Sequence, residues 1–198
     1  ALQSFVVNWN GGSQNCPAVT NCRVTGLQNN VDYSFTVSAV TEAGTSDPSA
    51  PATARPDAKP NQPAVPTMKF GDRVIDLSWP ATTVPDGGSP VTQYKIQVSP
   101  GINGQTEFTT ADTAWQATGL SNGTAYRFRI QALNRYAEGN VARESEYLWS
   151  DYSAPEIPAG APIGQGAPTV NKNKASGAAP SATVSWGAPG AVSYTHLR

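Results

Sequence analysis

The sequence predicts an all-β protein built from tandem antiparallel β-sandwiches, and three observations lead to this fold class. Glycine and proline are frequent, at 18 and 17 of 198 residues, and they separate short clusters of Val, Ile, Thr, Tyr, Phe and Trp. Apolar and polar residues alternate within these clusters, which is the period of a strand with one buried face. The same alternating segment occurs twice along the chain, which indicates repeated units.

The clearest repeat is a turn followed by a strand. The segments TGLQN (25–29) and YSFTVSA (33–39) recur as TGLSN (118–122) and YRFRIQA (126–132). Apolar residues occupy alternate positions of the second segment in both copies, which predicts one buried face. The expected core positions are Leu27, Tyr33 and Phe35 in the first copy and Leu120, Tyr126, Phe128 and Ile130 in the second.

Three further matches extend the repeat. The segment SDPSAP (46–51) recurs as SDYSAP (150–155) at a larger spacing, so the second copy carries an insertion between the matched segments. The segment IDLSW (75–79) is matched by ATVSW (182–186). The segment YKIQV (94–98), whose Tyr94 we expect in the core, corresponds to FVVNW (5–9), so the chain is expected to open within a repeat.

These segments resemble fibronectin type III repeats, an immunoglobulin-like sandwich family with strands A to G. The resemblance rests on a strand ending in Trp79, the entry GGSPVTQY (87–94) and the pattern G-L-x-N-x-x-x-Y-x-F-x-I-x-A from residue 119. It implies that Trp79 packs between the sheets and that the Tyr126 hydroxyl bonds nearby backbone in a tyrosine corner. By the same correspondence Tyr33 makes the corner of the first repeat, and Trp186 is the core tryptophan of the third. The Gly and Ala content and the turn sequences are similar to those of bacterial, particularly actinobacterial, surface proteins.

The matches predict four segments. Residues 1–56 supply strands C to G of one repeat, 57–160 form a complete repeat, and 161–191 supply strands A and B of a third. Proline-rich linkers at 51–66 and 155–168 are expected to behave as semi-rigid spacers. Residues 192–198 (VSYTHLR) resemble translated sequencing-adapter DNA and are expected to be non-native, which leaves His196 without a role; the alternative is a genuine strand C. We expect incomplete repeats at both ends to self-associate or to lack order, because each exposes an apolar face.

The composition of the chain limits the classes of binding partner that we expect. Charged residues make up 14% of the chain and the net charge is −1, which argues against nucleic-acid binding. No apolar run approaches the roughly 20 residues of a membrane-spanning helix, so we expect no membrane insertion by this segment. The expected partners are neighbouring repeats of the same chain and, if there is a ligand, an unidentified protein or glycan.

Cys16 and Cys22 are the only cysteines, and Pro17 lies between them. A metal site needs about four suitable ligands, and the only histidine is distant in sequence. A redox motif normally has two residues between its cysteines. A disulfide-closed loop is the preferred interpretation, with two free thiols as the alternative, and it favours an oxidising compartment.

No catalytic residue, cofactor or metal site is predicted. Ser-His and Cys-His pairs require a histidine near a nucleophile, and the carboxylates are scattered. Asp86 beside Gly87 and Gly88 predicts a turn, because a calcium or phosphate loop needs more acids or a following helix.

The segment 135–147 exceeds what a sandwich needs and lies between strands F and G. Exposed arginine and tyrosine side chains are typical of binding surfaces, so Arg135, Tyr136, Arg143 and Tyr147 form a possible binding loop. The alternative is a solvated loop, or one that packs on the neighbouring repeat.

The expected function is a non-catalytic structural spacer or stalk in an extracytoplasmic protein, either secreted or on the cell surface. The alternatives are an adhesion or glycan-binding module and an accessory module of a secreted polysaccharide-degrading enzyme. The sequence does not identify a ligand.

Overall fold

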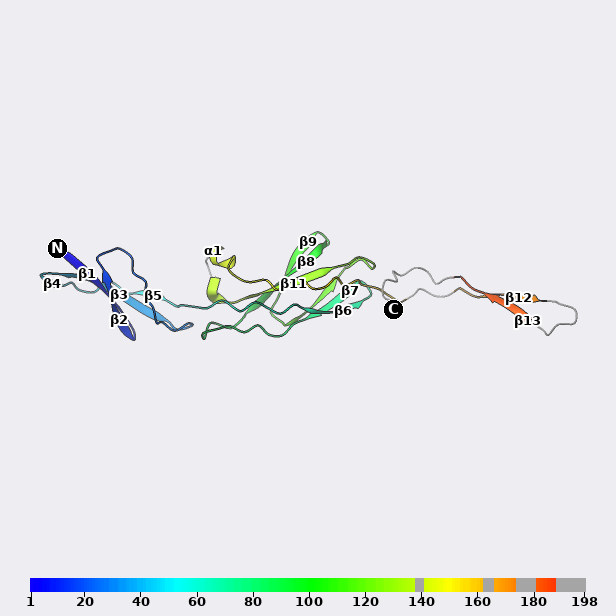
Figure 1. Ribbon diagram of the computed structural model, residues 1–198, viewed down its shortest axis with the longest axis horizontal. Coiled ribbons are helices and arrows are strands. Elements are labelled where there is room, and N and C mark those ends of the chain that lie inside the picture. The colour runs from blue at the N-terminus through cyan, green and yellow to red at the C-terminus, as the bar shows by residue number, and fades with distance from the viewer. Residues whose placement is uncertain (138–140, 162–165, 174–180, 188–198) are drawn as a thin grey trace. The chain divides into compact units, whose positions relative to one another are not determined.

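The computed structural model of the chain describes residues 1–137, 141–161, 166–173 and 181–187 (Figure 1). Contacts divide the chain into two compact units. One contains Ala1–Pro63, Ala81–Tyr94 and Gln131–Trp149, and the other contains Ala64–Pro80, Lys95–Ile130 and Ser150–Arg198. No helix among the described residues has the length and apolar character needed to cross a membrane.

The N-terminal residues form one antiparallel sheet in the order β2-β1-β3-β4, and β5 also pairs with β3. Asn10 and Gly11 form a two-residue hairpin turn between β1 and β2, and Gly11 adopts a φ of 124° that favours glycine. The strands are β1 (Leu2–Trp9), β2 (Gly12–Pro17), β3 (Tyr33–Thr41), β4 (Gly44–Thr45) and β5 (Ala52–Ala54).

Residues 18–32 contain no strand, although strand E was expected among them. In the middle repeat the equivalent residues, Ala114–Thr118, pair with strand B, which is Val74–Ser78. Residues 1–56 contain no counterpart of strand B, so this segment has no partner strand within the repeat.

The apolar face of this sheet is only partly covered. Tyr33 is buried, whereas Val37 is 39% exposed and Leu27 and Phe35 are half-buried. The expectation of a full core at Leu27 and Phe35 is therefore corrected. Alternation places Tyr33, Phe35 and Val37 on one face of β3, but residues 1–56 provide no second sheet to close over it.

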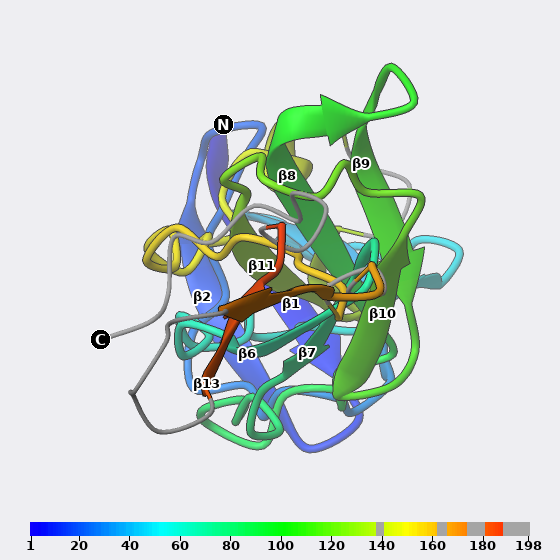
Figure 2. The ribbon, with the colours of Figure 1, turned by 90° about the vertical axis from the view of Figure 1, so that its right-hand side faces the viewer.

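The middle of the chain is a two-sheet sandwich, which confirms the predicted fold class. One sheet has the order β10-β7-β6 and the other β11-β8-β9, and Figure 2 shows the long β8–β9 hairpin. Asp72 and Arg73 form a two-residue turn between β6 and β7. The strands are β6 (Thr67–Gly71), β7 (Val74–Ser78), β8 (Gln93–Ile102), β9 (Gln105–Thr110), β10 (Ala114–Thr118) and β11 (Arg127–Leu133).

The core of the sandwich consists of inward-facing side chains. Trp115 of β10 meets Phe128 of β11 edge to face, with ring centroids 6.5 Å apart, so the two sheets touch at this point. Burial of one large apolar side chain contributes about 1.5–3 kcal/mol. The predicted core residues of this repeat that are buried are Trp79, Tyr94, Leu120, Tyr126, Phe128 and Ile130.

Serine side chains hold the last segment of each repeat to the preceding strand. In the middle repeat, Ser150 Oγ accepts the N–H of Ile130 at 3.0 Å and Ser153 Oγ accepts the N–H of Phe128 at 3.0 Å. The backbone N–H groups of both serines donate to the carbonyls of the same two residues.

The first repeat has the same arrangement. Ser46 Oγ accepts the N–H of Ala39 at 2.9 Å, and Ser49 Oγ accepts the N–H of Val37 at 3.1 Å. The recurring Ser-Asp-x-Ser motif is therefore explained by hydrogen bonding to strand F, which is β3 in the first repeat and β11 in the middle repeat.

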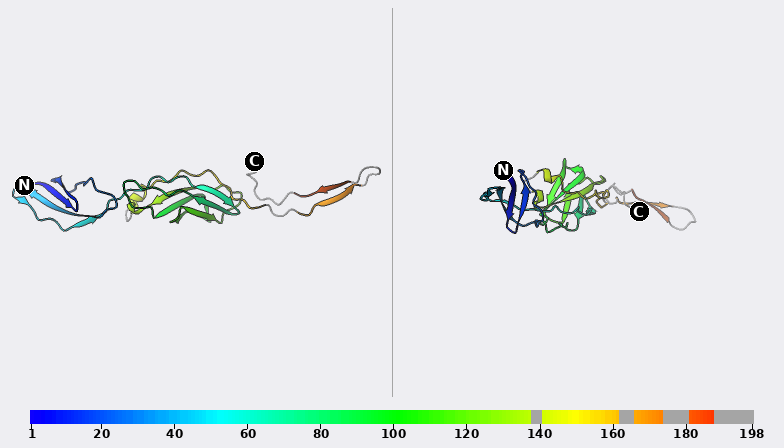
Figure 3. Two further views of the ribbon diagram at one scale, coloured as in Figure 1. Left: turned by 90° about the horizontal axis from the view of Figure 1, so that it is seen from below. Right: turned by 60° about the vertical axis from the view of Figure 1, so that its left-hand side comes forward.

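Beyond the middle repeat, β12 (Thr169–Asn173) and β13 (Ser181–Ser185) pair as an antiparallel hairpin (Figure 3). Trp186 is 66% exposed, which corrects its expected role as a core tryptophan. The described residues after 161 provide no second sheet to cover it. The predicted non-native segment 192–198 lies outside the described residues.

We predict a large loss of stability for one tryptophan substitution and almost none for a matched second one. Trp79 is 5% exposed, so Trp79→Ala should destabilise the middle repeat by about 3–5 kcal/mol through a core cavity. Trp186→Ala is the control and should change stability by less than about 0.5 kcal/mol. Urea midpoints followed by circular dichroism measure both, and an unchanged midpoint for Trp79→Ala would contradict the core assignment.

Candidate functional site

Buried tyrosine hydroxyls hold backbone turns in both repeats. The Tyr126 hydroxyl accepts the backbone N–H of Ser121 at 3.1 Å, and the Tyr33 hydroxyl accepts that of Gln28 at 3.0 Å. Each tyrosine bonds the residue five positions earlier, so the two corners have the same geometry. The Tyr94 hydroxyl also accepts a backbone N–H, that of Thr82, at 3.0 Å. These residues are structural, because their polar atoms are used within the fold.

Removing the Tyr126 hydroxyl should lower the stability of the middle repeat. Tyr126→Phe keeps the ring but deprives the Ser121 N–H of its acceptor, which should destabilise the middle repeat by about 1–2 kcal/mol. Tyr152→Phe is the control, because its hydroxyl bonds Gln97 on an exposed surface. Chemical denaturation compares the two variants, and equal midpoints for Tyr126→Phe and the parent would refute the role of this bond.

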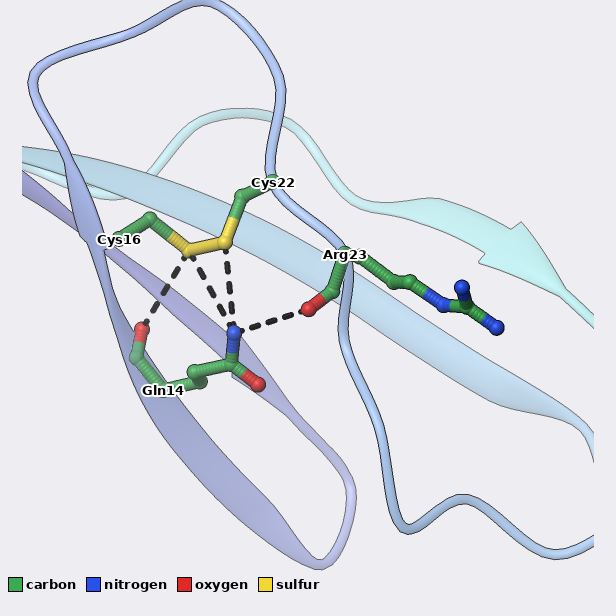
Figure 4. The surroundings of a disulfide bond; sticks show 4 residues. All are labelled: Gln14, Cys16, Cys22 and Arg23. Atoms are coloured by element: carbon green, nitrogen blue, oxygen red, sulfur yellow. Dashed lines mark hydrogen bonds between the residues drawn. A yellow bond between two sulfur atoms is a disulfide. The ribbon is translucent and has the colours of Figure 1, made fainter.

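The structure contains the predicted disulfide between Cys16 and Cys22, with Cα atoms 5.9 Å apart (Figure 4). Cys16 lies on β2, and Cys22 lies on the segment that follows it. Gln14 Nε2 lies beside the disulfide and donates to the Arg23 carbonyl at 2.9 Å. The closed loop covers part of the apolar face and leaves a cavity of about 120 Å³, lined in part by Phe5, Val7 and Val37.

We expect this disulfide to stabilise the N-terminal sheet. Chain entropy predicts about 2.4 kcal/mol for a loop of this length. The double variant Cys16→Ser/Cys22→Ser should lose about that amount in denaturation. Mass spectrometry of the unreduced peptide should show a mass two hydrogens below the dithiol form, and two alkylatable thiols in periplasm-expressed protein would contradict the assignment.

The predicted binding loop is largely ordered by its own contacts. It contains the 3₁₀ helix η1 (Arg135–Ala137) and the short helix α1 (Val141–Glu144). Tyr147 was expected to be exposed, but it is only 5% exposed, and this expectation is wrong. Its hydroxyl donates to the Asn134 carbonyl at 2.6 Å and accepts the Ala137 N–H at 3.1 Å. Tyr147 therefore fastens the insertion and is unavailable to a ligand.

The other predicted loop residues also have partners within the chain. The Tyr136 hydroxyl donates to Glu146 at 2.6 Å, and this hydrogen bond raises the pKa of Tyr136. The Arg143 guanidinium lies 5.0 Å from the centre of the Tyr136 ring. Arg135 forms an ion pair with Asp57, at 3.3 Å.

The linker before the middle repeat is attached to the inserted segment and to Trp149, which follows it. Lys59 Nζ donates to the Glu146 carbonyl at 3.1 Å, and Gln62 Nε2 donates to the Trp149 carbonyl at 2.9 Å. The sequence did not predict these contacts, because the paired residues are far apart along the chain.

Two surfaces of the middle repeat also escaped the sequence analysis. Arg127 and Arg129 lie with their guanidinium carbons 5.5 and 4.8 Å from the centre of the Tyr152 ring. A groove of about 530 Å³ runs over β6, β7 and β10, where Gln116 Nε2 donates to Asp76 at 2.8 Å. The alternating polar positions of the strands are the signal that could have identified both surfaces. No group of three or more His, Cys, Asp or Glu residues in the described part of the chain could hold a metal ion.

Comparison with known families identifies the fold family. The family described as "Fibronectin type III domain" matches residues 1–55 and 60–147. The chain therefore belongs to the fibronectin type III family, whose domains are generally non-catalytic modules.

Individual relatives match only part of their own length. Protein sidekick-2 of Gallus gallus is 29% identical over 150 residues, which is 71% of this chain and 7% of that protein. Exoglucanase B of Cellulomonas fimi is 33% identical over 153 residues, 69% of this chain and 13% of that protein. Among solved structures, domains A168-A170 from titin match with 19% identity and a TM-score of 0.48, covering 77% of this chain and 54% of that one. The chain thus spans a small part of these curated relatives.

Proposed function

We propose that this chain is a non-catalytic spacer within a multidomain extracytoplasmic protein. The observation that carries this proposal is the use of the inserted segment 135–147. Its buried tyrosine and its arginines bond within the chain, and its Glu146 carbonyl receives the Lys59 side chain of the preceding linker. A segment that holds its own linker suits a module whose task is to keep neighbouring domains apart.

Further features support this role. Fibronectin type III domains commonly serve as spacer or accessory modules, and the recurring proline-rich linkers limit bending because they favour extended conformations. The Cys16–Cys22 disulfide is suited to an oxidising compartment, which supports a secreted or cell-surface location. The resemblance to actinobacterial surface proteins is supported by the match to a Cellulomonas protein.

The spacer role predicts a defined distance between fused domains. Donor and acceptor fluorescent proteins attached to the two ends should give a narrower distance distribution in single-molecule energy transfer than a Gly/Ser linker of equal residue number. The same fusion in concentrated urea provides the unfolded control. A native distribution as broad as that of the Gly/Ser linker would contradict the proposal.

A second candidate is an accessory module of a polysaccharide-degrading enzyme. The similarity to Exoglucanase B favours it, and the groove over β6, β7 and β10 offers Asp76 and Gln116 as hydrogen-bonding groups for sugar hydroxyls. Sedimentation with insoluble cellulose separates the two functions. A spacer should stay in the supernatant, whereas binding that is lost in Gln116→Ala would favour the accessory role.

A further inference from the structure

The middle repeat surrounds one carboxylate of the preceding linker with polar groups. The Asp57 side chain is only 3% exposed. The backbone N–H of Ser89 donates to one of its oxygens at 2.7 Å, and the Ser89 hydroxyl donates to the other at 2.6 Å. The Arg135 guanidinium lies 3.3 Å from the second oxygen. Burying an aspartate is costly unless the charge is paired and hydrogen-bonded, and both conditions are met here.

Hydrogen bonds also hold the backbone next to Asp57. Asn134 Nδ2 donates to the carbonyls of Ala58 and Ser89, at 2.8 Å each. A Cβ at Gly88 would lie 3.0 Å from the Ala58 carbonyl oxygen, so the absence of a side chain at Gly88 leaves room for the linker. The site is therefore shaped to the peptide at residues 57–58 as well as to its charge.

The chain contains a comparison for this arrangement. The N–H of Asn30 donates to the Pro56 carbonyl at 2.8 Å, and the equivalent N–H of Gly123 donates to the Pro158 carbonyl at 3.1 Å. These bonds align the linker PDAKP (56–60) with PAGAP (158–162), so Ala159 stands where the first linker has Asp57. The next linker therefore has no carboxylate at this position.

We propose that Ser89, Asn134 and Arg135 form a carboxylate-binding site that recognises an aspartate in the linker entering their own repeat, and that Asp57 occupies it as an acid-sensitive latch. Ser89 comes from the GGSPVT motif, and Arg135 begins the insertion that is absent from the first repeat. The latch fixes the linker onto the middle repeat at this junction, and a linker with alanine at the equivalent position offers nothing to bind. The mechanical role of the Asp57 latch rests on the proposed spacer function, whereas the existence of the carboxylate-binding site does not.

The latch should open in acid. Burial acts to raise the pKa of Asp57, but hydrogen bonds from Ser89 and Ala58 and the charge of Arg135 outweigh it, so this pKa lies below its ordinary value. The stabilising contribution is therefore complete above about pH 4, the usual pKa of aspartate, and is lost as the pH falls through the lower folded value. Among the described residues, Arg135 is the charged group that faces Asp57, and Lys59 directs its amine to the Glu146 carbonyl.

Carboxyl NMR titration of the full chain tests the site directly. Asp57 should titrate below the ordinary aspartate value of about 4, and the Ser89 amide should shift with the same midpoint. Arg135→Gln should raise that midpoint, whereas Arg143→Gln, in the same insertion, should leave it unchanged. An Asp57 midpoint at or above the ordinary aspartate value would overturn the proposal.

Hydrogen exchange provides a second measurement. Asp57→Asn should speed exchange of the Ser89 amide by about tenfold or more, because the charged acceptor of that N–H is lost. Asp112→Asn should not change it. The Ile130 amide reports whether the core remains folded. Unchanged Ser89 exchange in Asp57→Asn would also overturn the proposal, and neither measurement depends on the distance between fused domains.

Discussion

Two serine hydroxyls in each repeat join the last extended segment to strand F, and the rest of the repeat depends on this connection. A strand at a sheet edge normally pairs through its backbone alone. Here each serine adds a side-chain acceptor, so Phe128 and Ile130 of β11 have acceptors for their N–H groups although the segment that follows the insertion is not a continuous strand. Strand F carries the inward-facing core residues, and a firmly bonded strand F keeps them in register.

This anchoring explains why the second repeat can carry an insertion. The chain leaves strand F after Leu133 and returns at Ser150, and the serine contacts are the same as in the first repeat, where a tight turn makes the connection. The insertion therefore adds structure at one end of the sandwich while the serine contacts to strand F are kept. That end is where the linker arrives, so the added residues contact the linker.

The sequence predicted the features that follow from local pattern. Alternation and the internal repeat located most of the strands, the resemblance to fibronectin type III repeats implied the tyrosine corners, and cysteine spacing favoured the disulfide. Alternation shows which side chains share a face but not whether another sheet covers that face, so the exposure of Trp186 and the half-burial of Phe35 could not be predicted. Tyr147 lies in a segment without a counterpart in the first repeat, so no comparison showed that it faces inward. The pairing of Asp57 with Ser89 joins residues distant in sequence, and neither residue alone indicates it.

The inserted segment has its own small interior, in which Tyr147 bonds Asn134 and Ala137. Several described polar groups of the insertion bond within it or bond the preceding linker, so a repeat can gain or lose such a segment with little change in the sandwich core. Repeats of one array can then share a common framework and still differ at their joints. Variation in a single connection between strands F and G is a route by which evolution can adjust one joint of a long protein while the others stay unchanged.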